Sequence, residues 1–397
     1  MNRKHNWCWL GWALWLIPLV VIAVIIAAHP LTRSMTPAYH EAVDNWWGQH
    51  AIYIGPAGFN YLPAFLPFFS LYAWLPLAVC EILWRCSAFG GLGFGLWRCL
   101  DLMTAKNRWR AFVLVSVLSL PICLSALRNG QSSALLAASL VLAAWCLHRQ
   151  RWWPAVAWLS LALICKPLAI PAIGLAVMIF PGLWWRAAIG VVLVLVSPYC
   201  FAPPGYVNEV YAAFASNIAA CFEPGGGGRT FADLNGVLMV ANIKLTGMTS
   251  LIVRVAAGAA MAVACWFLRG LGADSRRVLL WLGFSGIYIM LFTPMNEANS
   301  YVMLAPALGL WAQWLLEHHA RWSVWVVVAI CVSMMFLPDL VGLALGKYSG
   351  NEFAKFWCPL MTIIFLAMLV AQMRKALAES QNPGAPGNNN LRASTTS

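Results

Sequence analysis

Long apolar runs separated by short polar segments make up almost the whole chain of 397 residues. Many runs approach the roughly 20 residues that an α-helix needs to cross the hydrocarbon layer of a membrane. The pattern therefore predicts an all-α protein, a polytopic transmembrane bundle of about twelve helices. The predicted spans lie near residues 9–28, 63–84, 111–127, 132–147, 153–167, 168–181, 187–202, 251–268, 278–293, 300–316, 322–340 and 357–373.

Both ends of the chain carry polar segments. The first apolar run follows the basic start Asn2-Arg3-Lys4-His5, which is also typical of a cleaved signal peptide, but the run is longer than a usual signal-peptide core. We therefore expect an uncleaved anchor. From Ser380 onward the chain has no apolar periodicity and cannot form a core. The sequence predicts a membrane domain over residues 1–379 and a disordered cytoplasmic tail over residues 380–397.

The charge pattern indicates a topology. Lys and Arg number 25 against 13 Asp and Glu, and the basic residues cluster at the ends of apolar runs. The positive-inside rule then predicts that both termini face the cytoplasm, in a plasma (inner) membrane protein, and favours no nucleic-acid partner. This threading places on the cytoplasmic side Arg3, Lys4, Arg85, Arg98, Lys106, Arg108, Arg110, Arg149, Arg151, Arg186, Arg269, Arg276, Arg277, Arg321, Arg374 and Lys375. Eight of the thirteen acids fall in outer loops or at an outer span end.

The cysteines and the known catalytic motifs narrow the chemistry. Most of the twelve cysteines fall inside apolar runs without repeated spacing, as packing residues do. Only Cys200 and Cys221 flank one outer loop, and a disulfide between them is not favoured. No HExxH, CxxC or GxSxG motif is present, so the sequence predicts no protein-bound metal, redox thiol pair or hydrolase elbow.

The first outer loop, residues 29–62, contains a short amphipathic stretch after Pro37. In a helix, Tyr39, Ala42, Val43 and Trp46 would face the membrane, and Glu41 and Asp44 would face water. A carboxylate at this depth suits a general base acting on a lipid-linked substrate, which makes Glu41 and Asp44 the catalytic candidates. The alternative is that both residues form the solvated face of an interfacial helix.

Two further outer segments offer polar side chains for binding. Asn60 and Tyr61 precede the helix start at Pro63, which is also explained as a plain helix start. Arg128 and Gln131 lie in a turn between two spans, where they can bind a phosphate or a sugar or simply form the turn.

Lys166 lies in an apolar run, where an ammonium group is costly enough to suggest function. Snorkelling of its side chain to the interface is the alternative.

Two later loops complete the candidate set. Arg229 follows four glycines in the loop 203–250, which suits a mobile lid over an anionic head group, or else a flexible loop without function. Asn235 follows in the same loop, and Asn296 and Glu297 occupy another outer turn. All these features converge on one membrane face, which indicates a single extracytoplasmic site.

The order of several short motifs resembles glycosyltransferase family 87. The motifs are Tyr39 with Ala42, Tyr61-Leu62-Pro63-Ala64-Phe65, Trp74-Leu75-Pro76, Asn129-Gly130-Gln131, Lys166-Pro167, and Thr293-Pro294 before Tyr301. The resemblance implies the GT-C fold and transfer of a hexose, most often mannose, from a polyprenyl phosphate to a lipid or glycan acceptor. It implies membrane lipids as partners and no cofactor, although a divalent cation is not excluded.

One departure from the family pattern concerns the base. The family opens this loop with an Asp-Phe pair whose Asp is the expected base, and here Met35-Thr36 occupy that place. Glu41 or Asp44 would have to replace it. Arg128, Lys166 and Arg229 are available to stabilise the phosphate leaving group. Two rival classes remain, a transporter or lipid flippase and a non-catalytic relative of the family.

Overall fold

The computed structural model describes residues 3–30, 33–54, 59–105, 107–222, 231–243, 245, 247–272 and 274–381. These residues form helices and connecting segments, and no strand occurs among them. The predicted all-α class is therefore confirmed.

Sixteen α-helices follow one another within the described residues. They are α1 (Arg3–Ala28), α2 (Thr36–Trp47), α3 (Phe65–Ala73), α4 (Leu77–Cys99), α5 (Arg108–Arg128), α6 (Ser132–His148), α7 (Trp152–Cys165), α8 (Ile170–Ile179), α9 (Trp184–Val196), α10 (Pro204–Phe222), α11 (Leu234–Leu238), α12 (Gly247–Phe267), α13 (Ser275–Phe292), α14 (Ala305–Glu317), α15 (Arg321–Leu345) and α16 (Lys347–Gln381). Two short 3-10 helices matter for the site, η2 (Pro167–Ala169) and η8 (Ala298–Met303).

Membrane-spanning length is common among these helices. Eight helical segments in the described part of the chain are long and apolar enough to cross a membrane, and three shorter apolar helices accompany them. α14 is a further helix between α13 and α15 in the chain. This matches the predicted bundle of about twelve helices. Because α16 continues to Gln381, the predicted domain boundary after residue 379 falls in its last turn and stays a prediction.

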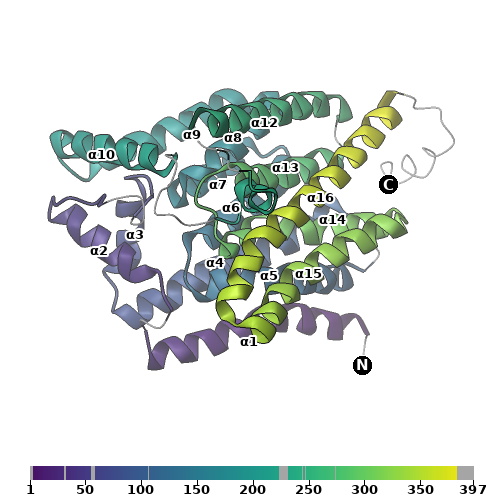
Figure 1. Ribbon diagram of the computed structural model, residues 1–397, viewed down its shortest axis with the longest axis horizontal. Coiled ribbons are helices and arrows are strands. Elements are labelled where there is room, and N and C mark those ends of the chain that lie inside the picture. Colours follow the sequence, from purple (N-terminus) through teal and green to yellow (C-terminus); the bar gives the residue numbers. More distant parts are fainter. Residues whose placement is uncertain are drawn as a thin grey trace.

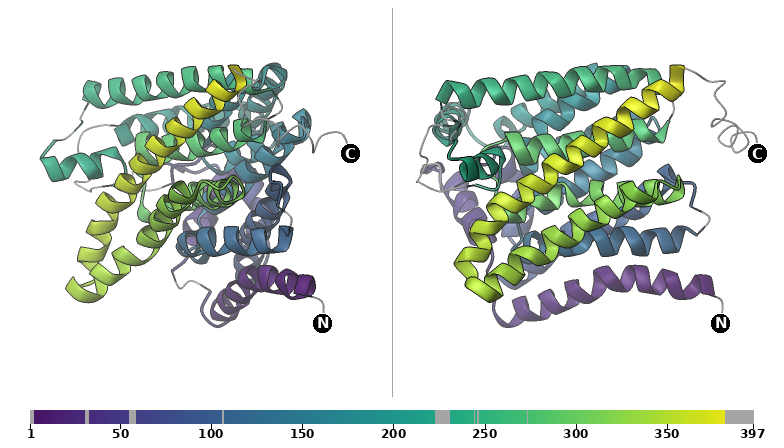
Figure 2. Two further views of the ribbon diagram at one scale, coloured as in Figure 1. Left: turned by 90° about the vertical axis from the view of Figure 1, so that its right-hand side faces the viewer. Right: turned by 45° about the vertical axis from the view of Figure 1, so that its right-hand side comes forward.

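The bundle has two distinct ends (Figures 1 and 2). The first residues of α1 and the last residues of α16 lie at one end, which we call the terminal end. α2, α3 and α10 lie at the opposite end, which we call the α2 end.

One predicted span is wrong. The segment 63–84 is not a single helix, because the chain ends α3 at Ala73 and restarts α4 after Pro76, which has an extended ψ of 137°. Proline lacks an N–H to continue a helix and is tolerated at its start. α4 then runs from the α2 end through residues 86–97 to Cys99. Arg85 consequently lies in the first turns of α4, at the α2 end, and not beside Arg98 as the charge pattern predicted.

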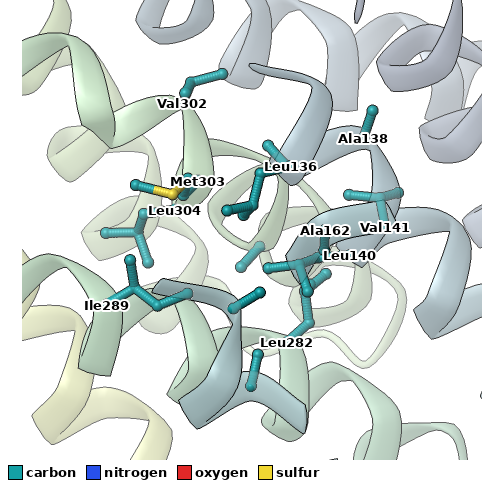
Figure 3. Packing of buried hydrophobic residues seen from close by; sticks show 14 of the residues in the cluster. Leu136, Ala138, Leu140, Val141, Ala162, Leu282, Ile289, Val302, Met303 and Leu304 are labelled. Atoms are coloured by element: carbon teal, nitrogen blue, oxygen red, sulfur yellow. The ribbon is translucent and has the colours of Figure 1, made fainter. Parts of the chain in front are cut away.

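α6 forms the centre of the bundle. Almost every residue of this helix is buried, which follows from a sequence that is apolar on all sides. Figure 3 shows Leu136 and Leu140 of α6 among Leu282 and Ile289 of α13 and Leu304, which precedes α14. α6 packs on α4, α7 and α13, so it holds the early and late parts of the chain together.

Candidate active site

α2 is amphipathic, as predicted, but its apolar face contacts protein and not lipid. Tyr39, Val43 and Trp46 are each about 1% exposed. The ring of Tyr39 meets the rings of Phe65 and Phe69 edge to face, at centroid distances of 5.1 and 5.2 Å. The aromatic residues of α3 cover this face, so the expectation that it lies against the membrane is wrong.

The candidate bases lie on the other face of α2. Glu41 and Asp44 are exposed, and neither side chain forms a hydrogen bond or ion pair within the described residues. The structure therefore does not bring them together with Tyr39, although both helical positions are those predicted.

A cluster of hydroxyl groups joins three elements at the α2 end. The hydroxyl groups of Tyr39 and Tyr61 are 2.9 Å apart and share a hydrogen bond. The backbone N–H of Ser132, at the start of α6, donates to the hydroxyl of Tyr39 at 3.3 Å. Burial raises the pKa of Tyr61 well above its usual value, so its hydroxyl stays protonated and can donate a hydrogen bond. Tyr39 and Tyr61, which the sequence places in separate segments, are thus joined through their hydroxyl groups.

Lys166 lies beside this cluster, at the break between α7 and η2. The residue has an extended backbone, with φ of −158° and ψ of 141°, which is the conformation favoured before a proline such as Pro167. Its Nζ lies 5.9 Å from the centre of the Tyr61 ring. The carboxylate of Glu297 is close enough to interact electrostatically with Lys166. Two predicted binding residues, Tyr61 and Lys166, therefore lie side by side, and Glu297 acts on Lys166 electrostatically.

The α5–α6 turn borders the same end. Gly130 has a left-handed φ of 64°, and its carbonyl accepts a hydrogen bond of 2.8 Å from the indole of Trp84. The Oε1 atom of Gln131 is buried and has no hydrogen-bond partner in the described residues. Arg128 is exposed at the rim. Of this predicted pair, Gln131 faces inward and Arg128 outward.

A buried ion pair in this region escaped the sequence analysis. Arg85 and Glu81 are 1% and 0% exposed and form a salt bridge within α4. Arg85 also donates to the backbone carbonyl of Arg128 at 2.9 Å and to the hydroxyl of Ser34 at 3.1 Å. The pair therefore ties the segment before α2 to the α5–α6 turn. The Glu81 and Arg85 spacing of four residues was its only sequence signal.

The place of the missing family Asp is adjacent to this pair. The backbone N–H of Met35 donates to the carbonyl of Asn129 at 2.9 Å. Thr36 is fully buried, and its hydroxyl lies 2.9 Å from that of Ser34. Neither position supplies a carboxylate.

Two predicted amides are occupied by structural hydrogen bonds. The Nδ2 atom of Asn296 donates to the carbonyls of Ile289 and Met290, at 2.6 and 3.1 Å, and so caps the end of α13. Its Oδ1 has no partner in the described residues. Asn60 accepts a hydrogen bond from Asn217 of α10.

Asn235 lies away from the cluster, at the start of α11. Its Oδ1 accepts from the backbone N–H of Leu245 at 3.2 Å, and its own N–H donates to Asp233 at 3.0 Å. Asp233 is 4% exposed, and burial raises its pKa to about 6, opposed by the nearby Arg254. Arg229 lies outside the described residues.

Glu297 also lines a cavity of about 390 Å³. Residues of α16, among them Tyr348 and Asn351, form its opposite wall. Within the described residues, no three His, Cys, Asp or Glu side chains gather to hold a metal ion. The geometry provides a cation, hydroxyl donors and a carboxylate at one end of a helical bundle, which suits a phosphate-bearing substrate delivered from the membrane.

Fold and site together define a polytopic membrane protein with a polar site at one end of its bundle. The model of glycosyltransferase family 87 matches residues 59–294, more than half of the chain, and the chain belongs to this family. The protein is therefore a membrane glycosyltransferase by family. α2 and Glu297 lie outside the matched residues. Searches of curated proteins and of solved structures find no match.

Proposed function

We propose that the protein transfers a hexose, with mannose as the first candidate, from a polyprenyl phosphate to a hydroxyl group of a lipid or glycan acceptor. The position of Lys166 beside the ring of Tyr61, whose hydroxyl bonds that of Tyr39, carries the proposal. We assign the reaction to the extracytoplasmic side of the plasma membrane, following the charge pattern of the sequence.

The reaction needs two kinds of group. The acceptor oxygen attacks C1 of the hexose, the bond from C1 to the phosphate oxygen breaks, and polyprenyl phosphate leaves with the bonding electrons. A cation stabilises the negative charge that develops on the phosphate, and Lys166 has this role in the proposal. A carboxylate takes the proton of the acceptor hydroxyl.

Three carboxylates compete for the role of base. Glu41 and Asp44 follow the sequence prediction, and their exposure on α2 requires the acceptor to approach from that face. Glu297 differs because it lines a cavity and interacts with Lys166. Loss of a general base lowers the rate by about 10² to 10⁴ fold, so single substitutions distinguish the three.

Transfer of radiolabelled hexose tests the proposal. The purified protein is reconstituted in liposomes with polyprenyl-phosphate-mannose, or another polyprenyl-linked hexose, and a membrane lipid extract. Lys166→Gln is expected to lower transfer about 100-fold or more. Lys375→Gln is the matched control, because Lys375 is 66% exposed at the terminal end. Glu41→Gln, Asp44→Asn and Glu297→Gln then identify the base.

Two results would contradict parts of this proposal. If the wild-type protein transfers no hexose from any polyprenyl-linked donor, the proposed reaction is wrong, and a transporter or a non-catalytic relative becomes the better account. If Lys166→Gln transfers at the wild-type rate, the phosphate is stabilised elsewhere.

A further inference from the structure

A second cavity, of about 710 Å³, lies between α5, η8, α15 and α16. One wall is formed by α15 and is mostly apolar, with Met334, Met335, Pro338 and Leu343, and Asp339 is its one charged residue. We call this cavity the α15 groove. α15 has a membrane-spanning length, and most of it is not covered by other helices, so the groove adjoins the hydrocarbon layer.

Local sequence explains why the groove is open. Pro338 lies inside α15 and cannot donate a hydrogen bond to the carbonyl of Met334, which weakens the helix there. Gly350 of α16 meets α15 closely, since a Cβ on Gly350 would lie 2.5 Å from the carbonyl oxygen of Pro338. A Cβ on Gly342, by contrast, would meet nothing nearer than 3.7 Å. The two helices pack along much of their length, approach most closely where Gly350 meets Pro338 and Gly342, and leave the groove beside this crossing.

The polar side of the groove carries more positive than negative charge. Arg33 and Lys347 line it, and among the described residues neither forms an ion pair. Arg128 lies close enough to Arg33 for the two guanidinium groups to repel each other. Asp339 is the one carboxylate among the lining residues. An apolar wall beside two available cations is complementary to an anionic lipid.

The groove continues into the cavity that holds Glu297. Ala298, Asn299 and Asn351 line both spaces. A lipid with its chains against α15 would therefore direct its head group toward Glu297, which in turn interacts with Lys166.

We propose that the α15 groove binds an anionic membrane lipid. Arg33 and Lys347 bind its phosphate, the hydrocarbon chains lie on Met334, Met335 and Leu343, and the head group enters the Glu297 cavity. Asp339 accepts hydrogen bonds from head-group hydroxyls. This inference rests on the proposed function in one respect, because the lipid bound here is then the acceptor whose hydroxyl is glycosylated.

Photo-crosslinking tests the groove without requiring activity. The full-length protein in nanodiscs is exposed to phosphatidylglycerol or phosphatidylcholine, each with a diazirine on the same acyl chain, and labelled residues are mapped by mass spectrometry. Phosphatidylglycerol is expected to label α15 around Met334–Leu343 roughly tenfold more than phosphatidylcholine, because two cations attract its net negative charge, whereas the choline ammonium neutralises the phosphate of phosphatidylcholine. Equal labelling by the two lipids, or labelling elsewhere only, would overturn the proposal.

Variants test the two cations and the volume of the α15 groove separately. The double variant Arg33→Gln/Lys347→Gln is expected to lose the preference for phosphatidylglycerol, whereas Lys375→Gln keeps it. Gly342→Leu fills the groove and is expected to reduce labelling by both lipids. Gly174→Leu is its control, because a Cβ at Gly174 meets nothing within 4 Å.

Two further arms distinguish the sources of phosphate and the two proposals. Inorganic phosphate in millimolar excess is expected to leave labelling unchanged, and loss of labelling would make this a free-phosphate site instead. Preferential labelling of a protein that transfers no hexose would overturn the proposed function and leave the lipid site. Transfer of a hexose without preferential labelling would overturn the lipid site and leave the proposed function.

Discussion

The two ends of the bundle treat their charged residues differently. At the terminal end, Asp101 accepts hydrogen bonds from Arg108 and Arg149 at 2.5 and 2.9 Å. Arg276 binds Asp274 and Glu379, each at 2.6 Å. Other arginines of this end lie over aromatic rings, namely Arg98, Arg151, Arg186, Arg269 and Arg277. Each of these cations has a partner from the protein itself.

The α2 end leaves several cations available. Arg33, Arg128 and Lys347 form no ion pair within the described part of the chain, and Lys166 has the ring of Tyr61 and the longer-range attraction of Glu297 but no hydrogen-bonded carboxylate. A cation near a membrane is costly unless it is paired, so cations without carboxylate partners indicate a place for an anionic ligand. The comparison teaches that positive charge alone does not mark the site. What marks it is positive charge that has no hydrogen-bonded carboxylate from the protein.

Two cations at the α2 end are paired, Arg85 with Glu81 and Lys355 with Glu352, and the buried Arg85 pair offers the largest test of the comparison. Because Arg85 and Glu81 are both fully buried, Arg85→Gln leaves an uncompensated carboxylate, which costs about 3 to 5 kcal/mol. Thermal unfolding in detergent is expected to shift strongly downward. Arg276→Gln at the terminal end breaks partly exposed pairs and is expected to shift it far less.

A compensating double variant tests the reason for that loss. Arg85→Met/Glu81→Leu removes both charges and is expected to recover most of the stability, because an apolar pair of similar volume can replace a buried ion pair. If the double variant is as unstable as Arg85→Gln, the hydrogen bonds to Ser34 and Arg128 matter more than the charge.

The sequence predicted the helical class of the protein and the face of the bundle on which the candidate residues lie, but not which side chains contact each other. Apolar runs near the spanning length, together with cations at their ends, were enough to predict the bundle and to collect Tyr39, Tyr61, Lys166 and Glu297 on one face. These signals are local and repeat along the chain. They can therefore be recognised without knowledge of tertiary contacts.

Tertiary contacts decided the rest. The break at Pro76 is visible in the sequence, yet the apolar residues on both sides of it favoured one span, and this error placed Arg85 at the wrong end. The apolar face of α2 has the same pattern whether lipid or the rings of α3 cover it. The α15 groove depends on the crossing at Gly350, which no spacing predicts.

Gly130 gives a smaller test of the α2 end. Its φ of 64° is a left-handed conformation, and a Cβ there would lie 3.0 Å from the guanidinium group of Arg85. Gly130→Ala is expected to cost about 1 to 2 kcal/mol for the backbone alone. Gly270→Ala at the terminal end, where a Cβ meets nothing within 4 Å, should leave the melting temperature nearly unchanged. Equal shifts for both variants would contradict this account.

Asp233 gives a pH-dependent test of the α2 end, because burial raises its pKa although Arg254 lies nearby. Its pKa in the folded protein is about 6, above the ordinary value of 3.8 for an aspartic acid. The folded state therefore binds the proton more tightly, and local stability falls as the pH rises from about 4 through 6. Amide hydrogen exchange of residues 231–243, corrected for intrinsic rates, should become faster over this range.

Asp233→Asn decides whether the buried acid is the cause. The amide can keep the cap on the N–H of Asn235 but cannot ionise, so the pH dependence of exchange at residues 231–243 should disappear. If the dependence persists, another group titrates there, and the burial of Asp233 does not distinguish this part of the α2 end from the terminal end. If it disappears, a carboxylate is destabilised by burial at the α2 end, whereas Asp101 and Asp274 at the terminal end are satisfied by arginines.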